Sequence, residues 1–136
     1  RMGRSAAINL APASTGAAVA ITKALPEYDG KFDGIAVRTP VPVGSISDVT
    51  FISKRKTTRE EINQIFTEEA ATDRYKSVVA VSNDPLVSTD IIKSPFAAVI
   101  DLEMTRVVDG DLVKVMAWYD NEWGFTNQMI RQILSL

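Results

Sequence analysis

Two different spacings of apolar residues separate the predicted helices from the predicted strands. Apolar positions three or four residues apart mark one face of a helix. They predict helices over residues 17–25, 58–71 and 126–134. Short alternating or continuous apolar runs are typical of strands. They predict strands over residues 34–39, 46–52, 77–82, 96–100, 105–108 and 112–119.

The order of these elements predicts the fold class. Helices and strands do not alternate strictly, as they would in a purely parallel, doubly wound domain. We therefore expect an α+β domain, with a mixed, mostly antiparallel sheet and the helices packed on one face.

Local signals place several boundaries. Residues 12–16 are small and predict a turn, and Ser14 or Thr15 is suited to cap the helix that follows. Thr58 with Glu61 forms the sequence pattern of a capping box. Asp109-Gly110 between two apolar runs predicts a hairpin. The second helix is expected to bury an apolar stripe, which consists of Ile62, Ile65, Phe66 and Ala70.

Composition limits the chemistry. The chain has 136 residues, the size of one domain, and a net charge of −2, which argues against a nucleic-acid binder. No apolar run approaches the ~20 residues that span a bilayer. The sequence contains no Cys and no His, which removes disulfides, thiolate nucleophiles, imidazole bases and the commonest transition-metal ligands. We assign neither a catalytic residue nor a metal ligand to this chain.

Two features could bind anions. Thr15-Gly16 precedes a helix, whose unpaired N–H groups and positive dipole end attract negative charge. A plain helix cap is the simpler alternative, and it does not exclude an anion. Arg38 ends an otherwise apolar strand, where a cation is costly unless an anion meets it. A side chain that reaches solvent or a carboxylate explains Arg38 equally well. Arg1 and Arg4 are, on composition alone, terminal surface charges.

The densest signal is the aromatic segment Trp118–Gly124, which follows a predicted strand and precedes a helix. Asn121 within it carries both a donor and an acceptor, as recognition of an amide requires. A subunit interface or a strand-end core would use the same aromatic residues, and both alternatives stay open.

The segment WYDNEWG at 118–124 resembles the C-terminal signature of the glyceraldehyde-3-phosphate dehydrogenase family. Other motifs of that family occur in the right order along the whole chain. These are RMGR at 1–4, PASTGAA at 12–18, LPE at 25–27, GKFDGIAVRTP at 30–40, KTT at 56–58, DPLVS at 84–88 and VKV at 113–115.

The resemblance implies that residues 1–136 are most of a C-terminal catalytic domain. In the family, a Rossmann domain that binds NAD and the segments with a nucleophilic cysteine and its histidine precede this part. The implied reaction oxidises glyceraldehyde 3-phosphate. The cysteine attacks the aldehyde, hydride passes to NAD, and inorganic phosphate cleaves the thioester to 1,3-bisphosphoglycerate. The chain alone is therefore expected to be inactive.

The resemblance also carries roles to individual positions. Thr15 and Gly16 match phosphate contacts, Arg38 matches the arginine that binds the substrate phosphate, and Arg1 matches the arginine that completes the site of the attacking phosphate. Asn121 matches the asparagine that binds the nicotinamide carboxamide. A homotetramer in the cytoplasm is implied, with no nucleic acid or membrane partner.

Two departures from the family pattern stand out. Phe125 replaces a frequent Tyr, and residues 43–45 read Val-Gly-Ser where Asn-Val-Ser is usual.

Two other functions compete with this one. Erythrose-4-phosphate dehydrogenase shares the same C-terminal scaffold. A non-enzymatic module that keeps the fold for assembly or binding would explain the lack of Cys and His, although it would not need the phosphate and carboxamide residues.

Overall fold

The computed structural model describes residue 4 and residues 7–136. The chain divides into two compact units, Arg1–Pro42 and Val43–Leu136, and each is described by itself. The α+β class is confirmed, since helices accompany a two-stranded sheet in the first unit and a four-stranded sheet in the second.

The first unit is built on an antiparallel ribbon. Strand β1 (Ala11–Ser14) pairs with β2 (Ile35–Arg38), and helix α1 (Ala17–Ala24) and a 3₁₀ turn (Pro26–Tyr28) connect them. The prediction of a turn over residues 12–16 is therefore wrong for its first part. Pro12 is compatible with β1 because a strand with a single neighbour leaves one edge open, where a missing N–H costs nothing.

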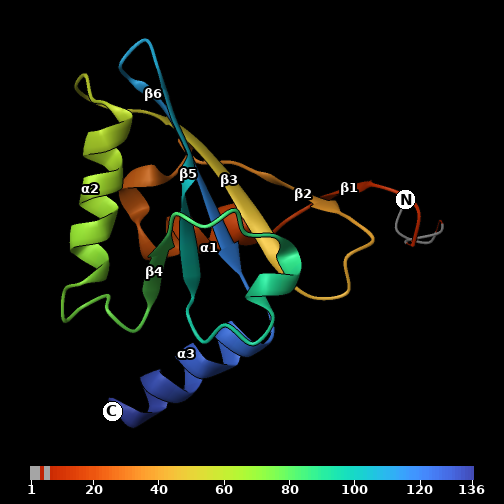
Figure 1. Ribbon diagram of the computed structural model, residues 1–136. Coiled ribbons are helices and arrows are strands. Elements are labelled where there is room, and N and C mark those ends of the chain that lie inside the picture. The colour runs from red at the N-terminus through yellow and green to blue at the C-terminus, as the bar shows by residue number, and fades with distance from the viewer. Residues whose placement is uncertain (1–3, 5–6) are drawn as a thin grey trace. The chain divides into compact units, whose positions relative to one another are not determined.

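The second unit is a mixed sheet with strand order β3-β6-β5-β4 (Figure 1). The β3-β6 and β6-β5 pairs are antiparallel, and β5-β4 is parallel. Its elements are β3 (Ser45–Ile52), α2 (Arg59–Ala70), β4 (Val79–Ser82), a 3₁₀ turn (Ser88–Ile91), β5 (Ala98–Val108), β6 (Leu112–Tyr119) and α3 (Trp123–Leu134).

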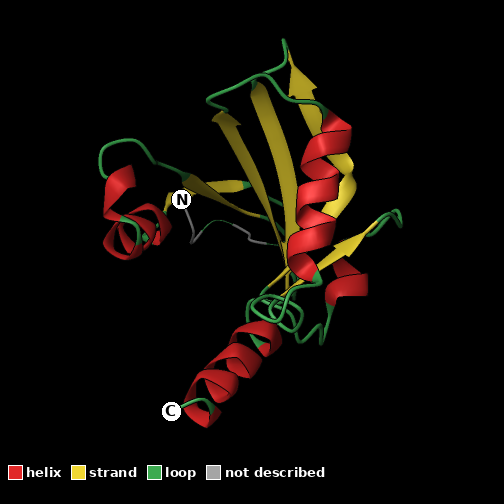
Figure 2. Ribbon diagram, turned by 90° about the vertical axis from the view of Figure 1, so that its left-hand side faces the viewer, coloured by secondary structure: helices red, strands yellow, loops and turns green. Residues whose placement is uncertain are grey.

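Helix α2 covers one face of this sheet, as Figure 2 shows from the side. Ile62 and Phe66 pack against a buried cluster from β5 and β6, which consists of Ile100, Leu102, Val113 and Val115. Thr58 caps the helix by accepting a hydrogen bond from the N–H of Glu61 (3.2 Å), as the capping pattern predicts. Ile65 is 44% exposed, so its predicted place in the buried stripe is wrong. The other predicted stripe residues, Ile62, Phe66 and Ala70, lie four positions apart on one face, and Ile65 falls at the margin of that face.

The two predicted strands at 96–100 and 105–108 form one strand, β5, with an irregular register between Asp101 and Arg106. Polar residues in this irregular part interrupt the apolar pattern, so the sequence predicts two strands where the structure has one. The hairpin to β6 forms as predicted. Asp109 (φ 49°) and Gly110 (φ 75°) both adopt the left-handed backbone that a tight turn requires.

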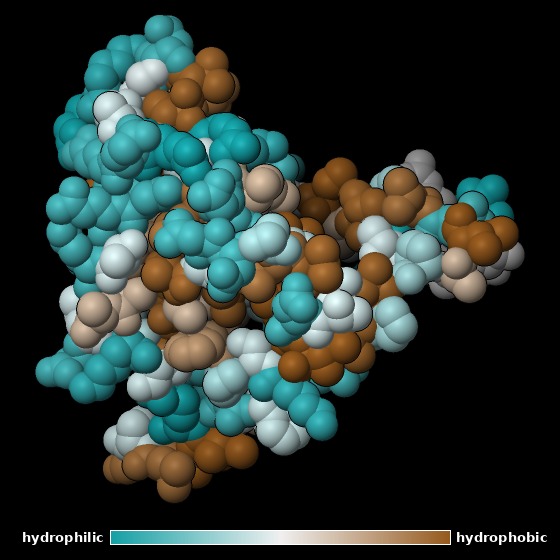
Figure 3. Space-filling view, viewed as in Figure 1, coloured by the Kyte–Doolittle hydropathy of each residue, from teal (hydrophilic) through white to brown (hydrophobic). Residues whose placement is uncertain are grey.

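Helix α3 begins at Trp123, three residues before its predicted start. It leads away from the end of the sheet where β6 finishes (Figures 1 and 2). Apolar side chains gather at its C-terminal end, while the outer surface of α2 is hydrophilic (Figure 3). The most exposed apolar residues of α3 are Phe125 in its first turn and Ile133 and Leu134 at its C-terminal end. Among the described residues, no helix combines the length and hydropathy needed to cross a membrane.

Candidate functional site

The turn at the start of α1 carries several N–H groups that have no acceptor among the described residues. Gly16 is the N-cap residue and has no side chain to cap the helix. The Thr15 hydroxyl accepts a hydrogen bond from the N–H of Ala17 (3.2 Å), so this side chain does part of the capping. Within the described part of the chain, no hydrogen bond engages the N–H groups of Gly16, Ala18 or Val19. Three donors at a helix N-terminus can meet an anion.

Gly16 leaves room for such an anion. Its φ of −81° is open to any residue, and a Cβ built on it would have no neighbour within 4 Å. The backbone at this turn is therefore accessible to a ligand, and its conformation does not require glycine.

Arg38 lies on the same ribbon as this turn. The register places it opposite Ala11, whereas Ser14 lies opposite Ile35 at the end next to Thr15. Three pairs separate the two levels, which is about 10 Å along the strand. The ribbon therefore presents a guanidinium at one end and the N-terminal turn of α1 at the other.

The premise that Arg38 sits in a buried strand is wrong. Arg38 is exposed, and its neighbours Ile35 and Val37 are 75% and 49% exposed. No ion pair of Arg38 occurs among the described residues. Burial therefore does not force an anion on it. Its charge is instead available to a ligand from outside.

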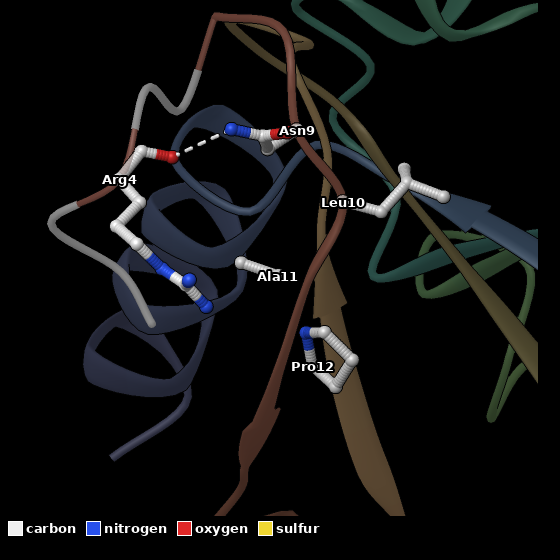
Figure 4. Close-up of a pocket in the computed structure, with 5 residues that line it drawn as sticks. All are labelled: Arg4, Asn9, Leu10, Ala11 and Pro12. Carbon is white, nitrogen blue, oxygen red and sulfur yellow. Dashed lines mark hydrogen bonds between the residues drawn. The ribbon is translucent and has the colours of Figure 1, made fainter.

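A shallow cavity of about 380 Å³ adjoins the Arg38 end of the ribbon. It is lined by Arg4, Asn9, Leu10, Ala11 and Pro12 (Figure 4). The Asn9 amide donates to the carbonyl of Arg4 (2.9 Å), and the Arg4 guanidinium points away from Asn9 toward the space beside Ala11 (Figure 4). Arg1, the other predicted phosphate ligand, lies outside the described residues.

Asn121 follows β6 in the second unit, and its side chain is exposed. The Ser45 hydroxyl, at the start of β3, donates to Asn121 Oδ1 (3.3 Å). No acceptor for the Asn121 Nδ2 donors occurs in the described part of the chain. An oriented amide with free donors can recognise a carbonyl group.

Gly44 explains the unusual residues 43–45. It has φ +91°, and a Cβ on it would lie 2.9 Å from the carbonyl oxygen of Ser88. A side chain at this position would meet strained backbone and a backbone oxygen together. The glycine thus lets the chain enter β3 with Ser45 next to Asn121.

Asp120 is a functional candidate that the sequence analysis missed. It is 3% exposed, and its Oδ1 accepts hydrogen bonds from the N–H groups of Glu122 (2.9 Å) and Trp123 (2.7 Å). Its Oδ2 accepts one from the N–H of Lys93 (2.8 Å). Burial alone would raise the pKa of the Asp120 carboxyl, but the N–H groups of Trp123, Lys93 and Glu122 together keep this pKa below its usual value.

The aromatic residues of the segment have separate surroundings. Trp118 is half-buried and donates its indole N–H to the buried carboxylate of Asp101 (3.0 Å), which fits a strand-end core. Trp123 is 50% exposed at the start of α3.

The one sequence signal that could have pointed to Asp120 is its position just before a helix, where Asp is a common cap.

Residues 1–121 match the model of the family described as glyceraldehyde 3-phosphate dehydrogenase, C-terminal domain. The chain is 48% identical to a glyceraldehyde-3-phosphate dehydrogenase of Kitasatospora aureofaciens and 46% identical to glyceraldehyde-3-phosphate dehydrogenase 1 of Streptomyces avermitilis. It is 44% identical to the enzyme of that name from Zymomonas mobilis. Each comparison covers 96% of this chain but only 38–39% of the relative, so the chain spans less than two-fifths of the relatives' length.

Proposed function

Because the chain belongs to the C-terminal domain family of glyceraldehyde 3-phosphate dehydrogenase, we propose that it supplies phosphate- and nicotinamide-contacting residues to an NAD-dependent, phosphorylating enzyme of glycolysis. The reaction would oxidise glyceraldehyde 3-phosphate with inorganic phosphate to 1,3-bisphosphoglycerate. The observation that carries this proposal is the exposed ribbon, where neither Arg38 nor the N–H groups at the start of α1 have a partner among the described residues.

The turn at Thr15-Gly16 would bind one phosphate group. The free N–H groups of Gly16, Ala18 and Val19 can each donate to a phosphate oxygen. The Thr15 hydroxyl accepts from Ala17 through its oxygen and keeps its own proton to donate.

Arg38 would bind the second phosphate, at the other end of the ribbon. A guanidinium donates two parallel hydrogen bonds to a phosphate, which favours arginine over lysine there. This second phosphate is the substrate phosphate, and Arg1 is proposed as a ligand of the attacking phosphate. Two anions at two levels of the ribbon match a reaction with one phosphorylated substrate and one inorganic phosphate.

Asn121 would bind the carboxamide of NAD. The residues present fit this group, because Ser45 occupies the oxygen of the Asn121 amide and leaves the nitrogen to donate to a carboxamide oxygen. When bound, NAD would accept the hydride from the substrate. The contribution of this chain would be to set the orientation of the nicotinamide ring.

We further propose that residues 1–136 act as part of a longer polypeptide. The chain has no Cys and no His, so a nucleophilic thiolate and an imidazole base must come from other residues of that polypeptide. A homotetramer in the cytoplasm, as the family resemblance implies, completes the proposal.

Kinetics of the complete polypeptide test the phosphate role. Loss of a charge-assisted hydrogen bond in Arg38→Ala is expected to raise the KM for the phosphorylated aldehyde roughly 10- to 100-fold, measured as NADH formation. Arg74→Ala is the matched control, since Arg74 is an exposed arginine that lies over the ring of Tyr75. Unchanged KM in Arg38→Ala would contradict the assignment, and NADH formation by the 136-residue chain alone would contradict its expected inactivity.

A further inference from the structure

The turn that presents Asn121 is closed by one buried carboxylate. Asp120 has no cationic partner in the described part of the chain, and three backbone N–H groups stabilise its charge instead. A buried charge without a counterion is costly, and a plain helix cap would need only one of these three bonds. Helix capping alone therefore does not account for the three hydrogen bonds to Asp120.

The two oxygens of Asp120 make different connections. Oδ1 bonds to Glu122 and Trp123, which closes the turn around Asn121 and starts α3. Oδ2 bonds to Lys93, which is 27 residues away in sequence and has the left-handed φ of 66°. A non-glycine residue in that region is under strain and persists only where its surroundings fix it.

A second contact joins the same two segments. Gly124 is buried in the first turn of α3, and a Cβ on it would lie 2.5 Å from the carbonyl oxygen of Phe96 and 3.3 Å from that of Ser94. The loop at residues 93–96 and the turn at 120–124 are thus joined once by hydrogen bonding and once by close backbone packing. Asn121 lies in the part of the turn that these contacts fix.

We propose that Asp120 is a positioning residue that sets the orientation of Asn121 toward the nicotinamide carboxamide, with its Oδ2–Lys93 bond as the essential tether. This inference rests on the proposed role of Asn121. Ser45 orients the amide from the β3 side, and Asp120 fixes the backbone that carries it. Asp120 itself does not contact the ligand.

Asp120→Asn separates the tether from the cap. The amide oxygen can still accept from Glu122 and Trp123, whereas the amide nitrogen would face the N–H of Lys93, donor against donor. Helix α3 should begin as before, and only the link to the loop should be lost.

The experiment measures NAD affinity in the complete polypeptide. Asp120→Asn and Asn121→Ala are each expected to raise the KM for NAD roughly three- to tenfold, the value of one neutral hydrogen bond. The KM for NAD of the double variant should be no higher than that of the more affected single variant, because both changes remove the same contact. Thr58→Ala, which removes the cap of α2, controls for lost stability and should leave the KM for NAD unchanged.

A spectroscopic readout separates this proposal from the proposed function. The Asn121 side-chain NH₂ resonances should shift in Asp120→Asn and stay in place in Thr58→Ala. Unshifted resonances, or KM effects that add in the double variant, would overturn the positioning role. An unchanged KM in Asn121→Ala together with shifted resonances would instead refute the carboxamide contact and leave the tether standing.

Discussion

Gly124 offers a sharp test of how closely α3 approaches the loop before β5. Gly124→Ala would place a methyl group 2.5 Å from the carbonyl oxygen of Phe96, a contact that real Cβ atoms essentially never make. The atom in the way belongs to the backbone, so no side-chain rotation relieves the clash. Overpacking of this kind costs about 1–3 kcal/mol.

The higher helix propensity of alanine offsets part of this cost. Within a helix, alanine is more favourable than glycine by about 1 kcal/mol. Since the obstacle is backbone, the clash belongs at the upper end of its range, and the net loss of unfolding free energy is expected to be about 2 kcal/mol. For a chain of this size, that corresponds to a fall in Tm of roughly 8 °C.

Urea unfolding, followed by fluorescence of Trp118 and Trp123, measures this loss. Gly34→Ala is the control, because a Cβ on Gly34 would have no neighbour within 4 Å and its backbone is not in the left-handed region. The control should stay within about 0.5 kcal/mol of the natural chain. A Gly124→Ala variant as stable as the natural chain would refute the close approach, and with it the second contact that fixes the Asn121 turn.

Two further changes test other parts of the second unit. Hydrogen bonds from Arg55 and Thr57 lower the pKa of Glu61 to about 2, so its stabilising contribution should be complete above pH 4.5 and disappear as the pH falls toward 2. The stability difference between the natural chain and Glu61→Gln, measured by urea midpoints across this range, should shrink toward acid. A constant difference would contradict the assignment. Gly44→Ala meets both left-handed backbone and the Ser88 carbonyl oxygen, and should cost about 2 kcal/mol or more in thermal unfolding. A neutral result would contradict the geometry that places Ser45 beside Asn121.

Local signals predicted elements well where the stabilising contacts are local. The Thr58 cap of α2 and the Asp109-Gly110 hairpin each depend on residues within three or four positions, and both form as predicted. The periodicity of Ile62 and Phe66 correctly identified the buried side of α2.

Errors arose where the deciding contact is distant in sequence. Pro12 obscured β1, whose existence depends on pairing with Val37. The register irregularity after Asp101 hid the continuity of β5, and neighbouring strands maintain that continuity. The start of α3 at Trp123 depends on Asp120, whose carboxylate is in turn fixed by Lys93.

The candidate site divides in the same way. Asn121 and Thr15 could be found because they lie in short motifs with a recognisable chemistry. The Ser45 hydroxyl that orients Asn121 is 76 residues away in sequence, so no local pattern indicates it. The sequence also could not predict that Arg38 is exposed. An apolar strand suggests burial, but β2 has only one neighbouring strand, and this pairing is not visible in the local pattern.

The strand order of the four-stranded sheet has a consequence for synthesis of the protein. Among the strands that the structure describes, β3 pairs only with β6, and Leu112 follows its partner Ile52 by 60 positions in the sequence. At about 5–20 residues per second, a ribosome would need roughly 3–12 s to make that intervening chain. During this interval Val49 and Phe51 have no partner strand, so β3 is the segment of the nascent chain most open to pairing with the wrong edge.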